Sequence, residues 1–595
     1  MRILMVVGIF VLTLFAAQLL RIQGLESAAT AAEARSQRIA TEVIPAQRGT
    51  IYDAHDTVLA TSQERRKVVI DQTAVPAYKR KVDGETTTVG VQGAAEQLAP
   101  LLQTDPATLA GALTGDQRYV VLATGVTPST WREIYRLGIP GVYSERTSIR
   151  SYPQSSNVSP LVGFVRPNDQ TAGGGLELML DQTLKGKDGK AVYEVGRDGS
   201  RLPNARSDVS EQLAGRDVRL TIDNDIQWYA QNALAQQVKK TGAESGTVVV
   251  QRRTGELVAL ASYPSFDPTK LNSNKGTFAN LAFSDVFEPG STTKVITVAA
   301  GLEEGKVTPD TPVVIPNTIR RYDRTLRDSH PHPTLYRTVT GTLAESSNIG
   351  TIFISETMAP KTIDQYYRKF GLGTTSGSGF PGESAGLLPP VEKWGAVQRY
   401  TMSYGQGISA TAMQVSGVFQ TIANGGVRVA PTLVSEVQDA DGRWQAAPTP
   451  KSTRVVSDKT AREVSHMLEG VVTDQGTAPQ ARVPGYRVAG KTGTADRYSA
   501  EVGGYSGKTA SFVGYAPAGD PQLVVTVIIQ RPTRGYYGGA TAGPVFKDVM
   551  TYALQREQVA PSAEDAKPPK LTIELDGPPP AGTEVLKDRG TKAGG

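Results

Sequence analysis

The chain has 595 residues, no Cys, four His and a formal net charge of +5. The absence of thiols excludes a disulfide-stapled module, a thiolate zinc site, an iron–sulfur protein and a cysteine nucleophile. The 63 basic residues are interleaved with 58 acidic ones, so no basic block predicts nucleic-acid binding. The length predicts about three or four domains, and the composition is that of a globular protein.

The N-terminal segment predicts a membrane anchor. Residues 3–20 are apolar except for Thr13 and Gln18, and Arg2 and Arg21 flank them. This run matches the length of a helix that crosses the hydrocarbon core. A cleaved signal peptide is the alternative, but its candidate cleavage sites lie well beyond the apolar run. We expect one uncleaved span with the bulk of the chain outside the cytoplasm, as in a bacterial envelope protein that does without disulfides.

The segments that follow differ in composition and in predicted secondary structure. Residues 21–44 are polar, Ala-rich and helix-compatible, which is typical of a stalk. Residues 45–216 mix short strands, helices and turns and predict an α+β region. A strand at 218–222 leads into a helix at 223–240, which Gly242 ends as a C-cap.

The second half of the chain predicts a sheet covered by helices. A β-hairpin is expected over residues 247–260, followed by a helix-rich middle over 284–468. Strands return over residues 486–530, and the apolar segment 523–529 predicts a buried strand. Residues 544–558 predict a closing helix packed on that sheet. The remaining Pro- and Gly-rich residues predict a flexible tail.

The sharpest local motif is a Ser followed three residues later by a Lys. The turn Pro289-Gly290 places Ser291 at the start of a helix, where free backbone N–H groups favour developing negative charge. Lys294 falls on the same helix face. A serine needs a base within reach, and an amine serves if burial and a nearby cation lower its pKa.

Two further motifs matter in combination with the first. Residues 346–348, Ser-Ser-Asn, supply a hydroxyl and a carboxamide, and residues 491–494, Lys-Thr-Gly-Thr, supply a cation, hydroxyls and a strand edge for a carboxylate and an oxyanion. Copies at 155–157 and 240–242 show that single trigrams arise by chance or for capping. Chance does not explain the ordered set, in which 291 begins a helix and 491 ends a strand.

This ordered set resembles the penicillin-binding proteins and serine β-lactamases. The resemblance extends to class B penicillin-binding proteins, because residues 48–53 and 175–177 resemble motifs of their non-catalytic pedestal. The implied structural residues of the pedestal are Arg48, Gly49, Asp53 and Glu177. Ala54 and Asp56 depart from the family, which often has Arg and Gly there, and leave the local turn open.

The resemblance implies an α+β fold with a transmembrane helix, an elongated α+β pedestal and a serine β-lactamase-like transpeptidase domain, in which helices flank an antiparallel sheet. The expected parts are a short cytoplasmic end at 1–2, the anchor at 3–20, the stalk at 21–44, a pedestal of the dimerisation type at 45–216, the transpeptidase domain at 217–558 and the tail at 559–595.

The resemblance also implies a serine-type D-alanyl-D-alanine transpeptidase. Ser291 would be acylated by a peptidoglycan stem peptide that ends in D-alanyl-D-alanine, and β-lactam antibiotics would trap the same serine. Lys294 would take the Ser291 proton, and Ser346 would pass a proton to the leaving D-alanine. Asn348 would hold the substrate amide, and Lys491 would help keep Lys294 neutral.

The strand residues Thr492, Gly493 and Thr494 would bind substrate. Both threonines would contact the carboxylate, and the backbone N–H groups of Ser291 and Thr494 would form the oxyanion hole. Neither a metal nor an organic cofactor is implied.

Several other functions remain to be weighed. Residues 382–386, Gly-Glu-Ser-Ala-Gly, fit the nucleophile elbow of α/β-hydrolases, but flanking prolines argue against the strand and helix that this elbow joins. His330 and His332 could ligate a metal, but ordinary loop hydrogen bonds are the simpler interpretation. A β-lactamase would lack the pedestal, and a β-lactam sensor would need an output domain, for which two residues ahead of the anchor leave no room.

The biological role and partners are implied by the same resemblance. Residues 287–290 and the start of the pedestal resemble the septal, cell-division branch more than the elongation branch. We expect a single-pass protein of the cytoplasmic membrane at the division septum. Its partners would be a membrane lipid II polymerase, since no glycosyltransferase domain is seen, and other division proteins. An elongation-type enzyme and a catalytically silent division scaffold remain alternatives.

Overall fold

The structure is a computed structural model that describes residues 2–21, 39–82, 84–167, 170–194, 208–274, 277–562 and 571–590. It divides into two compact units. The first consists of Met1–Gly49, Ser62–Ser151 and Gln182–Arg216. The second consists of Thr50–Thr61, Tyr152–Asp181 and Asp217–Gly595. The division differs from the contiguous pedestal predicted over 45–216, because β2 (Ile51–Tyr52) pairs in parallel with β10 (Val218–Leu220) of the second unit.

The predicted apolar helix is present as α1, Arg2–Leu20. Its mean hydropathy of 2.6 and its length make it the one described helix that could cross a membrane. Residues 22–38 of the expected stalk lie outside the described residues. The end of that stalk is a strand, β1 (Ile39–Ile44), which pairs antiparallel with β8 (Gly189–Glu194). The β-branched residues of this segment favour a strand over the expected helix.

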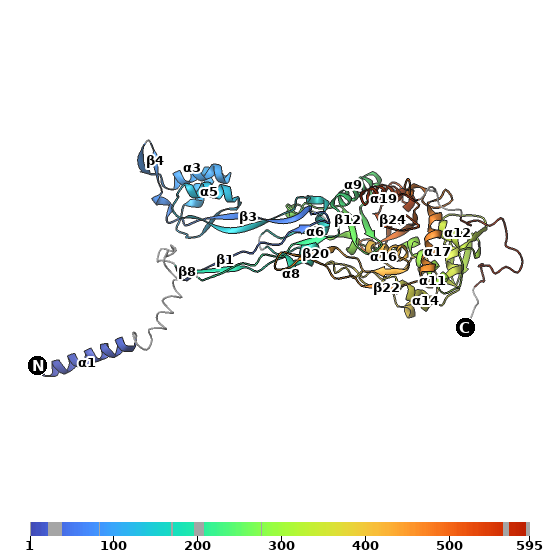
Figure 1. Cartoon of the computed structure of the whole chain (residues 1–595), viewed down its shortest axis with the longest axis horizontal. Coiled ribbons are helices and arrows are strands. Elements are labelled where there is room, and N and C mark those ends of the chain that lie inside the picture. The colour runs from blue at the N-terminus through green and yellow to red at the C-terminus, as the bar shows by residue number, and fades with distance from the viewer. Residues whose placement is uncertain are drawn as a thin grey trace. The chain divides into compact units, whose positions relative to one another are not determined.

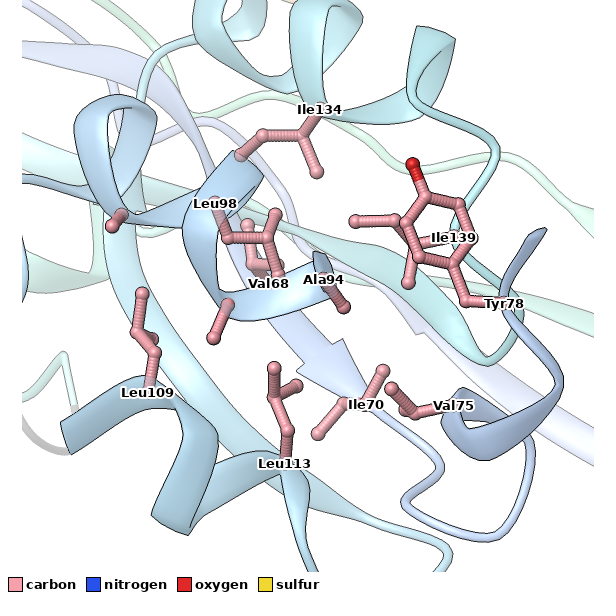
Figure 2. Packing of buried hydrophobic residues seen from close by; sticks show 12 residues of the cluster. Val68, Ile70, Val75, Tyr78, Ala94, Leu98, Leu109, Leu113, Ile134 and Ile139 are labelled. Carbon is pink, nitrogen blue, oxygen red and sulfur yellow. The ribbon is translucent and has the colours of Figure 1, made fainter. Parts of the chain in front are cut away.

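The first unit is built around helices packed on strands. Buried residues of β3 (Val58–Ile70), α3 (Gly90–Leu102), α4 (Pro106–Leu113) and α5 (Pro128–Arg136) form one cluster, which Figure 2 shows. The other elements are β4 Lys79–Val82, β5 Glu85–Thr88, β6 Val120–Val126, β7 Val142–Ser151, α8 Asp181–Leu184 and β9 Asp208–Ser210, together with the 3-10 turn η2 Val75–Ala77.

The second unit contains a five-stranded antiparallel sheet in the order β12-β11-β25-β24-β23. Its strands are β11 Ser245–Arg252, β12 Leu257–Tyr263, β23 Ala489–Ser499, β24 Gly504–Ala516 and β25 Leu523–Gln530. Every residue of β25 is buried, as predicted. The predicted helices are present as α9 (Asn224–Thr241), with Gly242 as its C-cap, and α19 (Gly543–Arg556). Both lie on one side of the sheet, and α16 (Ala412–Ala423) lies on the other (Figure 1).

The helix-rich middle is confirmed. Its remaining helices are α10 Leu281–Ser284, α11 Lys294–Glu303, α12 Val339–Ala344, α13 Asn348–Ser355, α14 Pro360–Lys369, α15 Gln398–Met402 and α17 Asp458–Glu469. Short strands connect them: β13 Val286–Phe287, β14 Pro312–Ile315, β15 Thr318–Arg321, β16 Arg324–Arg327, β17 Leu335–Thr338, β18 Ala410–Thr411, β19 Val427–Val429, β20 Val434–Gln438, β21 Trp444–Ala446 and β22 Ser452–Arg454.

Short helical turns complete the second unit. They are η3 Ser155–Asn157, α6 Ser159–Val162, α7 Gly175–Met179, η4 Leu271–Ser273, η5 Gly290–Thr293, η6 Val391–Lys393, η7 Gly470–Val472, η8 Pro479–Ala481 and α18 Gly538–Thr541.

The C-terminal segment 571–590 is packed on the second unit, which corrects the prediction of a flexible tail over 559–595 for these residues. Ile573 and Leu586 are buried. The carbonyl of Ile573 accepts a backbone hydrogen bond of 3.2 Å from β17, and Leu586 exchanges backbone hydrogen bonds of 3.0 and 2.9 Å with β14. The proline and glycine of the segment predicted a tail, but the burial of these two apolar residues and their backbone hydrogen bonds attach it to the β14–β17 hairpin.

A buried arginine strengthens this attachment. The Arg321 side chain at the end of β15 is only 1% exposed. Its Nε lies 2.7 Å from Glu356 Oε1, and its Nη1 lies 2.9 Å from Asp588 Oδ1. Removing the cation would leave two carboxylates facing each other in a partly buried site.

We expect Arg321→Ala to lower the free energy of unfolding by about 3 kcal/mol, since both carboxylates lose their partner. The matched control is Arg324→Ala in the neighbouring strand, whose side chain is 73% exposed and 3.8 Å from Asp323. An exposed pair of this kind contributes less than about 1 kcal/mol. Denaturant unfolding of both variants measures the difference, and equal losses would contradict the structural role of Arg321.

Candidate active site

The predicted nucleophile lies in the tight turn η5, directly ahead of α11. Gly290 has a φ of 55°, and a Cβ there would lie 3.2 Å from the Cβ of Ala495 on β23. Glycine therefore allows both the left-handed backbone and the close approach of the strand. Ser291 is half-buried in this turn. The prediction that Ser291 begins a helix is confirmed.

Lys294 is one turn further along and fully buried. Its Nζ donates hydrogen bonds to the carbonyl oxygen of Ser346 and, at 3.2 Å, to Ser346 Oγ. Burial lowers the pKa of Lys294 to about 7, and the negative charge of Asp328 partly opposes this shift. The site thus contains an amine that is substantially neutral near physiological pH and touches a second hydroxyl.

The Ser-Ser-Asn segment connects α12 to α13 and has an unusual backbone. Ser346 adopts a left-handed φ of 64°, which is uncommon for a residue other than Gly, Asn or Asp. Ser347 caps α13 by accepting a hydrogen bond of 2.9 Å from Gly350 N. Asn348 Nδ2 donates to the carbonyl oxygen of Arg327 at 3.1 Å. The local geometry therefore presents Ser346 to Lys294.

The Lys-Thr-Gly-Thr segment lies on β23, next to the nucleophile turn. A Cβ at Gly493 would lie 3.1 Å from Thr292 Cγ2 and 3.2 Å from Pro289 O, so a side chain at this position would push the turn away. The sequence predicts that Lys491 ends a strand, and this is wrong. The strand begins at Ala489 and continues well past the motif, paired throughout with β24.

The strand places the two lysines close enough to interact. Lys491 is fully buried, and its pKa is lowered well below the ordinary value, first by burial and then by the charge of Lys294. Its Nζ lies 3.4 Å from Thr492 Oγ1, which in turn lies 2.8 Å from Thr477 Oγ1. Thr494 Oγ1 accepts a hydrogen bond of 3.1 Å from Gly538 N. The structure thus brings the three predicted motifs together.

The copies and competing motifs lie elsewhere. The second Ser-Ser-Asn forms η3, and Lys240-Thr241-Gly242 ends α9. Ser384 lies in a loop without the strand and helix of a hydrolase elbow. The histidines make ordinary hydrogen bonds, as interpreted from the sequence: His330 Nε2 lies 3.0 Å from the Tyr537 hydroxyl, and His332 Nδ1 lies 2.7 Å from the carbonyl oxygen of Pro333.

Two of the four predicted pedestal residues, Arg48 and Gly49, fall in the first unit. A Cβ at Gly49 would lie 2.1 Å from the carbonyl oxygen of Arg216, so only glycine fits. The carbonyl oxygens of Arg48 and Gly49 both accept hydrogen bonds from Arg150 Nη1, at 3.3 and 2.8 Å. These contacts tie the start of the pedestal sequence to β7.

The other two, Asp53 and Glu177, are buried in the second unit. Asp53 accepts hydrogen bonds from the backbone of His55 and Thr57 at 2.8 and 2.7 Å. Asp56, where the resemblance led us to expect Gly, has a left-handed φ of 64°, a conformation that Asp tolerates. Glu177 accepts a hydrogen bond of 3.4 Å from the Tyr152 hydroxyl.

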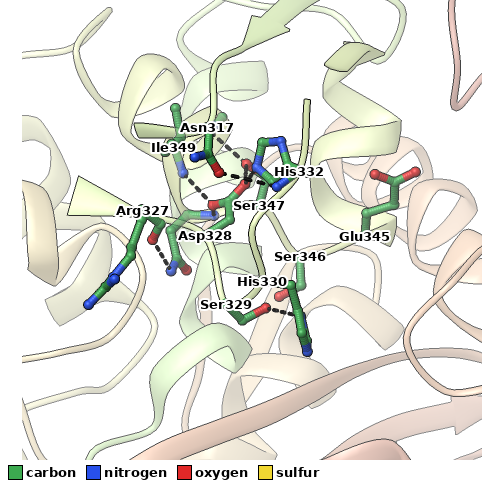
Figure 3. A network of polar contacts seen from close by, with 12 residues as sticks. Asn317, Arg327, Asp328, Ser329, His330, His332, Glu345, Ser346, Ser347 and Ile349 are labelled. Carbon is green, nitrogen blue, oxygen red and sulfur yellow. Dashed lines mark hydrogen bonds and ion pairs between the residues drawn. The ribbon is translucent and has the colours of Figure 1, made fainter. Parts of the chain in front are cut away.

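Sequence reasoning missed one acidic residue beside the site. Asp328 follows β16 and contacts the Ser-Ser-Asn segment, as Figure 3 shows. No local motif marks this residue, because its neighbours in space come later in the chain. Only the course of the β15–β16 hairpin reveals the contact.

Comparison with known proteins identifies both regions. Residues 245–551 match the penicillin binding protein transpeptidase domain, and residues 43–220 match the penicillin-binding protein dimerisation domain. Among curated relatives, the penicillin-binding protein PbpB of Mycolicibacterium smegmatis is 34% identical over 95% of this chain and 91% of its own length. The peptidoglycan D,D-transpeptidase FtsI of Escherichia coli is 32% identical over 75% of this chain and 74% of its own.

Solved structures agree with these matches. Penicillin binding protein 3 from Mycobacterium tuberculosis, in complex with aztreonam, has a TM-score of 0.69 and 30% identity, covering 90% of this chain and all of that one. A peptidoglycan synthetase from Bifidobacterium adolescentis has a TM-score of 0.74 at 30% identity, covering 90% of this chain and all of that one. With both family domains in order, and with a serine, two buried lysines and a left-handed Ser346 assembled beside β23, the chain belongs to the class B penicillin-binding proteins, the peptidoglycan D,D-transpeptidases.

Proposed function

We propose that this chain cross-links peptidoglycan stem peptides ending in D-alanyl-D-alanine through an acyl-enzyme on Ser291, and that β-lactams acylate the same serine. The observation that carries the proposal is the buried Lys294 amine, which lies one turn from Ser291 and donates hydrogen bonds to Ser346. A serine becomes a competent nucleophile when a neutral base is within reach.

The reaction has two acyl transfers. Ser291 Oγ attacks the carbonyl carbon of the penultimate D-alanine, and its proton moves to Lys294 Nζ. The amide bond then breaks, Lys294 returns its proton through the Ser346 hydroxyl to the departing D-alanine nitrogen, and an ester remains on Ser291. An amine from a neighbouring strand attacks the ester carbonyl, which forms the cross-linking amide and returns the hydroxyl to Ser291.

The remaining site residues bind the substrate. Asn348 would hold the stem-peptide amide. The hydrogen bond from Asn348 Nδ2 to the carbonyl oxygen of Arg327 sets the orientation of the Asn348 side chain. Thr492 and Thr494 would bind the terminal carboxylate. The approach of β23 to the nucleophile turn supports an oxyanion hole made by the backbone N–H groups of Ser291 and Thr494.

We place this activity in septal wall synthesis. The resemblance of residues 287–290 to the division branch and the similarity to PbpB and FtsI support this role. The helix α1 fits a single-pass anchor with an extracytoplasmic catalytic unit. A membrane lipid II polymerase and other division proteins would then be its partners at the septum.

Depletion of the protein in its native host tests this function. Filamentous or branched cells with failed septa are expected, and a wild-type copy should restore division. A copy with Ser291→Ala should fail to do so, because the septal wall would lack cross-links. Rounded cells with normal septa would instead indicate an elongation enzyme, and rescue by Ser291→Ala would indicate a silent scaffold.

A further inference from the structure

Asp328 forms a clamp on the start of α13. One carboxylate oxygen, Oδ1, accepts hydrogen bonds from the backbone N–H groups of Asn348 and Ile349, at 2.5 and 3.0 Å. The other oxygen, Oδ2, accepts a bond of 2.7 Å from Ser347 Oγ and lies 3.2 Å from His332 Nε2. Figure 3 shows the side chains of His332, from the loop after β16, and Ser347, from the start of α13, meeting at Asp328.

The hydrogen bonds of the clamp are shielded from solvent. The Asp328 side chain is 9% exposed and that of His332 is 14% exposed, so solvent competes little for these bonds. A carboxylate at free N–H groups of a helix start makes strong, charge-assisted hydrogen bonds. All three clamped groups follow Ser346 directly, so the clamp fixes the segment in which Ser346 keeps its left-handed backbone.

The clamp also reaches the reacting groups through Ser346. Both the carbonyl oxygen and the hydroxyl of Ser346 contact Lys294 Nζ, so any shift of the segment would move both contacts. On the other side, Arg327, the neighbour of Asp328, orients the Asn348 amide through its carbonyl oxygen. Arg327 at the end of β16 and Asp328 directly after it therefore contact the segment that carries both Ser346 and the Asn348 amide.

We propose that Asp328 is a positioning residue, which holds residues 346–348 in reactive geometry and, through its charge, tunes the general base Lys294. This inference rests on the proposed acyl-transfer function. Asp328 acts through the segment that it clamps, and hence through Ser346, and through its electrostatic field.

The charges around the base give the sign of the electrostatic effect. Among the described residues, Asp328 raises the pKa of Lys294, against the larger effect of burial. Lys491 on β23 interacts with Lys294 as a like charge. Tyr404 packs nearby, and its pKa is raised to about 12 by burial and by the charges of Asp328 and Glu288. His332 is the basic side chain that faces Asp328 directly. Removing the Asp328 charge should therefore lower the pKa of Lys294 further.

The test uses the full chain in detergent. It measures the second-order rate constant of acylation by fluorescent penicillin from about pH 5.5 to about pH 9, so that the profile brackets the pKa of Lys294. For Asp328→Asn we expect a rate about 10- to 100-fold lower at its plateau, from the lost charge-assisted bonds. The midpoint of the pH profile should move below its wild-type position, because the base loses its stabilising anion. A merely structural contact would lower the rate without moving the midpoint, and this outcome would overturn the proposal.

The matched control is Asp323→Asn at the tip of the same hairpin. Its side chain is 79% exposed and has no contact with residues 346–348 among the interactions of the described residues. We expect the wild-type rate and midpoint. The same change in both variants would contradict a specific role for Asp328, whereas failure of the wild-type protein to label at all would refute the acyl-transfer function itself.

A second variant covers the case in which Asp328→Asn does not fold. Ser347→Ala keeps the charge of Asp328 and removes one bond of the clamp, together with the N-cap bond that Ser347 Oγ accepts from Gly350 N. Its acylation should be slower with an unchanged midpoint, because the geometry changes and the field does not. A wild-type rate in Ser347→Ala would count against the clamp.

Discussion

Ser291→Ala is expected to abolish covalent labelling by fluorescent penicillin. The ester that retains the label forms on Ser291 Oγ, in the turn that leads into α11 and one helical turn from the buried Lys294. Loss of the nucleophile therefore removes the acyl-enzyme completely rather than slowing it. Gel fluorescence of the full chain after denaturation measures the effect.

The control for this experiment comes from the competing motif. Ser384 stands in the sequence Gly-Glu-Ser-Ala-Gly, but it lies in a loop, where its backbone N donates to the carbonyl oxygen of Phe283 at 2.9 Å. Ser384→Ala should label as the wild type does. Labelling retained in Ser291→Ala and lost in Ser384→Ala would reverse the assignment of the nucleophile.

Acylation by the wild-type protein is expected to rise with pH through about 7. Burial lowers the pKa of Lys294 to about 7, so the amine becomes available to take the Ser291 proton above this pH. Below it, the rate should fall roughly tenfold for each pH unit, since only the neutral amine accepts a proton. Lys294→Gln should lower the plateau rate on the order of 10²- to 10⁴-fold and remove this limb of the profile.

The control variant changes a lysine just beyond the end of the same helix. Lys306 is exposed after the end of α11, and Lys306→Gln removes one positive charge without touching the site. Its rate and pH profile should match those of the wild type. If the acylation rate of the wild type did not change between about pH 6 and about pH 9, a neutral lysine would be excluded as the base.

Local sequence patterns predicted the parts of the site that depend on neighbours in the chain. The turn at Pro289-Gly290, the C-cap at Gly242 and the buried strand at 523–529 each carry their own signal, in backbone preference or apolar composition. The association of Ser291, Ser346 and Lys491 required the family resemblance, because spacing alone does not fix which distant segments meet.

The features that were missed depend on distant contacts. Asp328 becomes a clamp only because a hairpin returns it to α13, and nothing in the hexapeptide around it indicates this. Residues 571–590 were predicted as a tail from their proline and glycine, but the surface that receives Ile573 and Leu586 is formed far earlier in the chain. The composition of a segment indicates whether it can fold by itself, but it does not indicate whether another part of the chain offers a surface on which the segment packs.

The order of the strands in the central sheet has a consequence for biogenesis. The hairpin of β11 and β12 ends at Tyr263, whereas β25, which pairs with the free side of β11, begins at Leu523. A chain whose segments cross the membrane in sequence order behind the α1 anchor would expose this apolar edge until the helical middle has also crossed. Unpaired apolar edges recruit other chains. Newly exported molecules should therefore pass through an aggregation-prone interval, which ends only when β25, the last of the five strands, pairs with β11 and joins the β23–β24 hairpin to it.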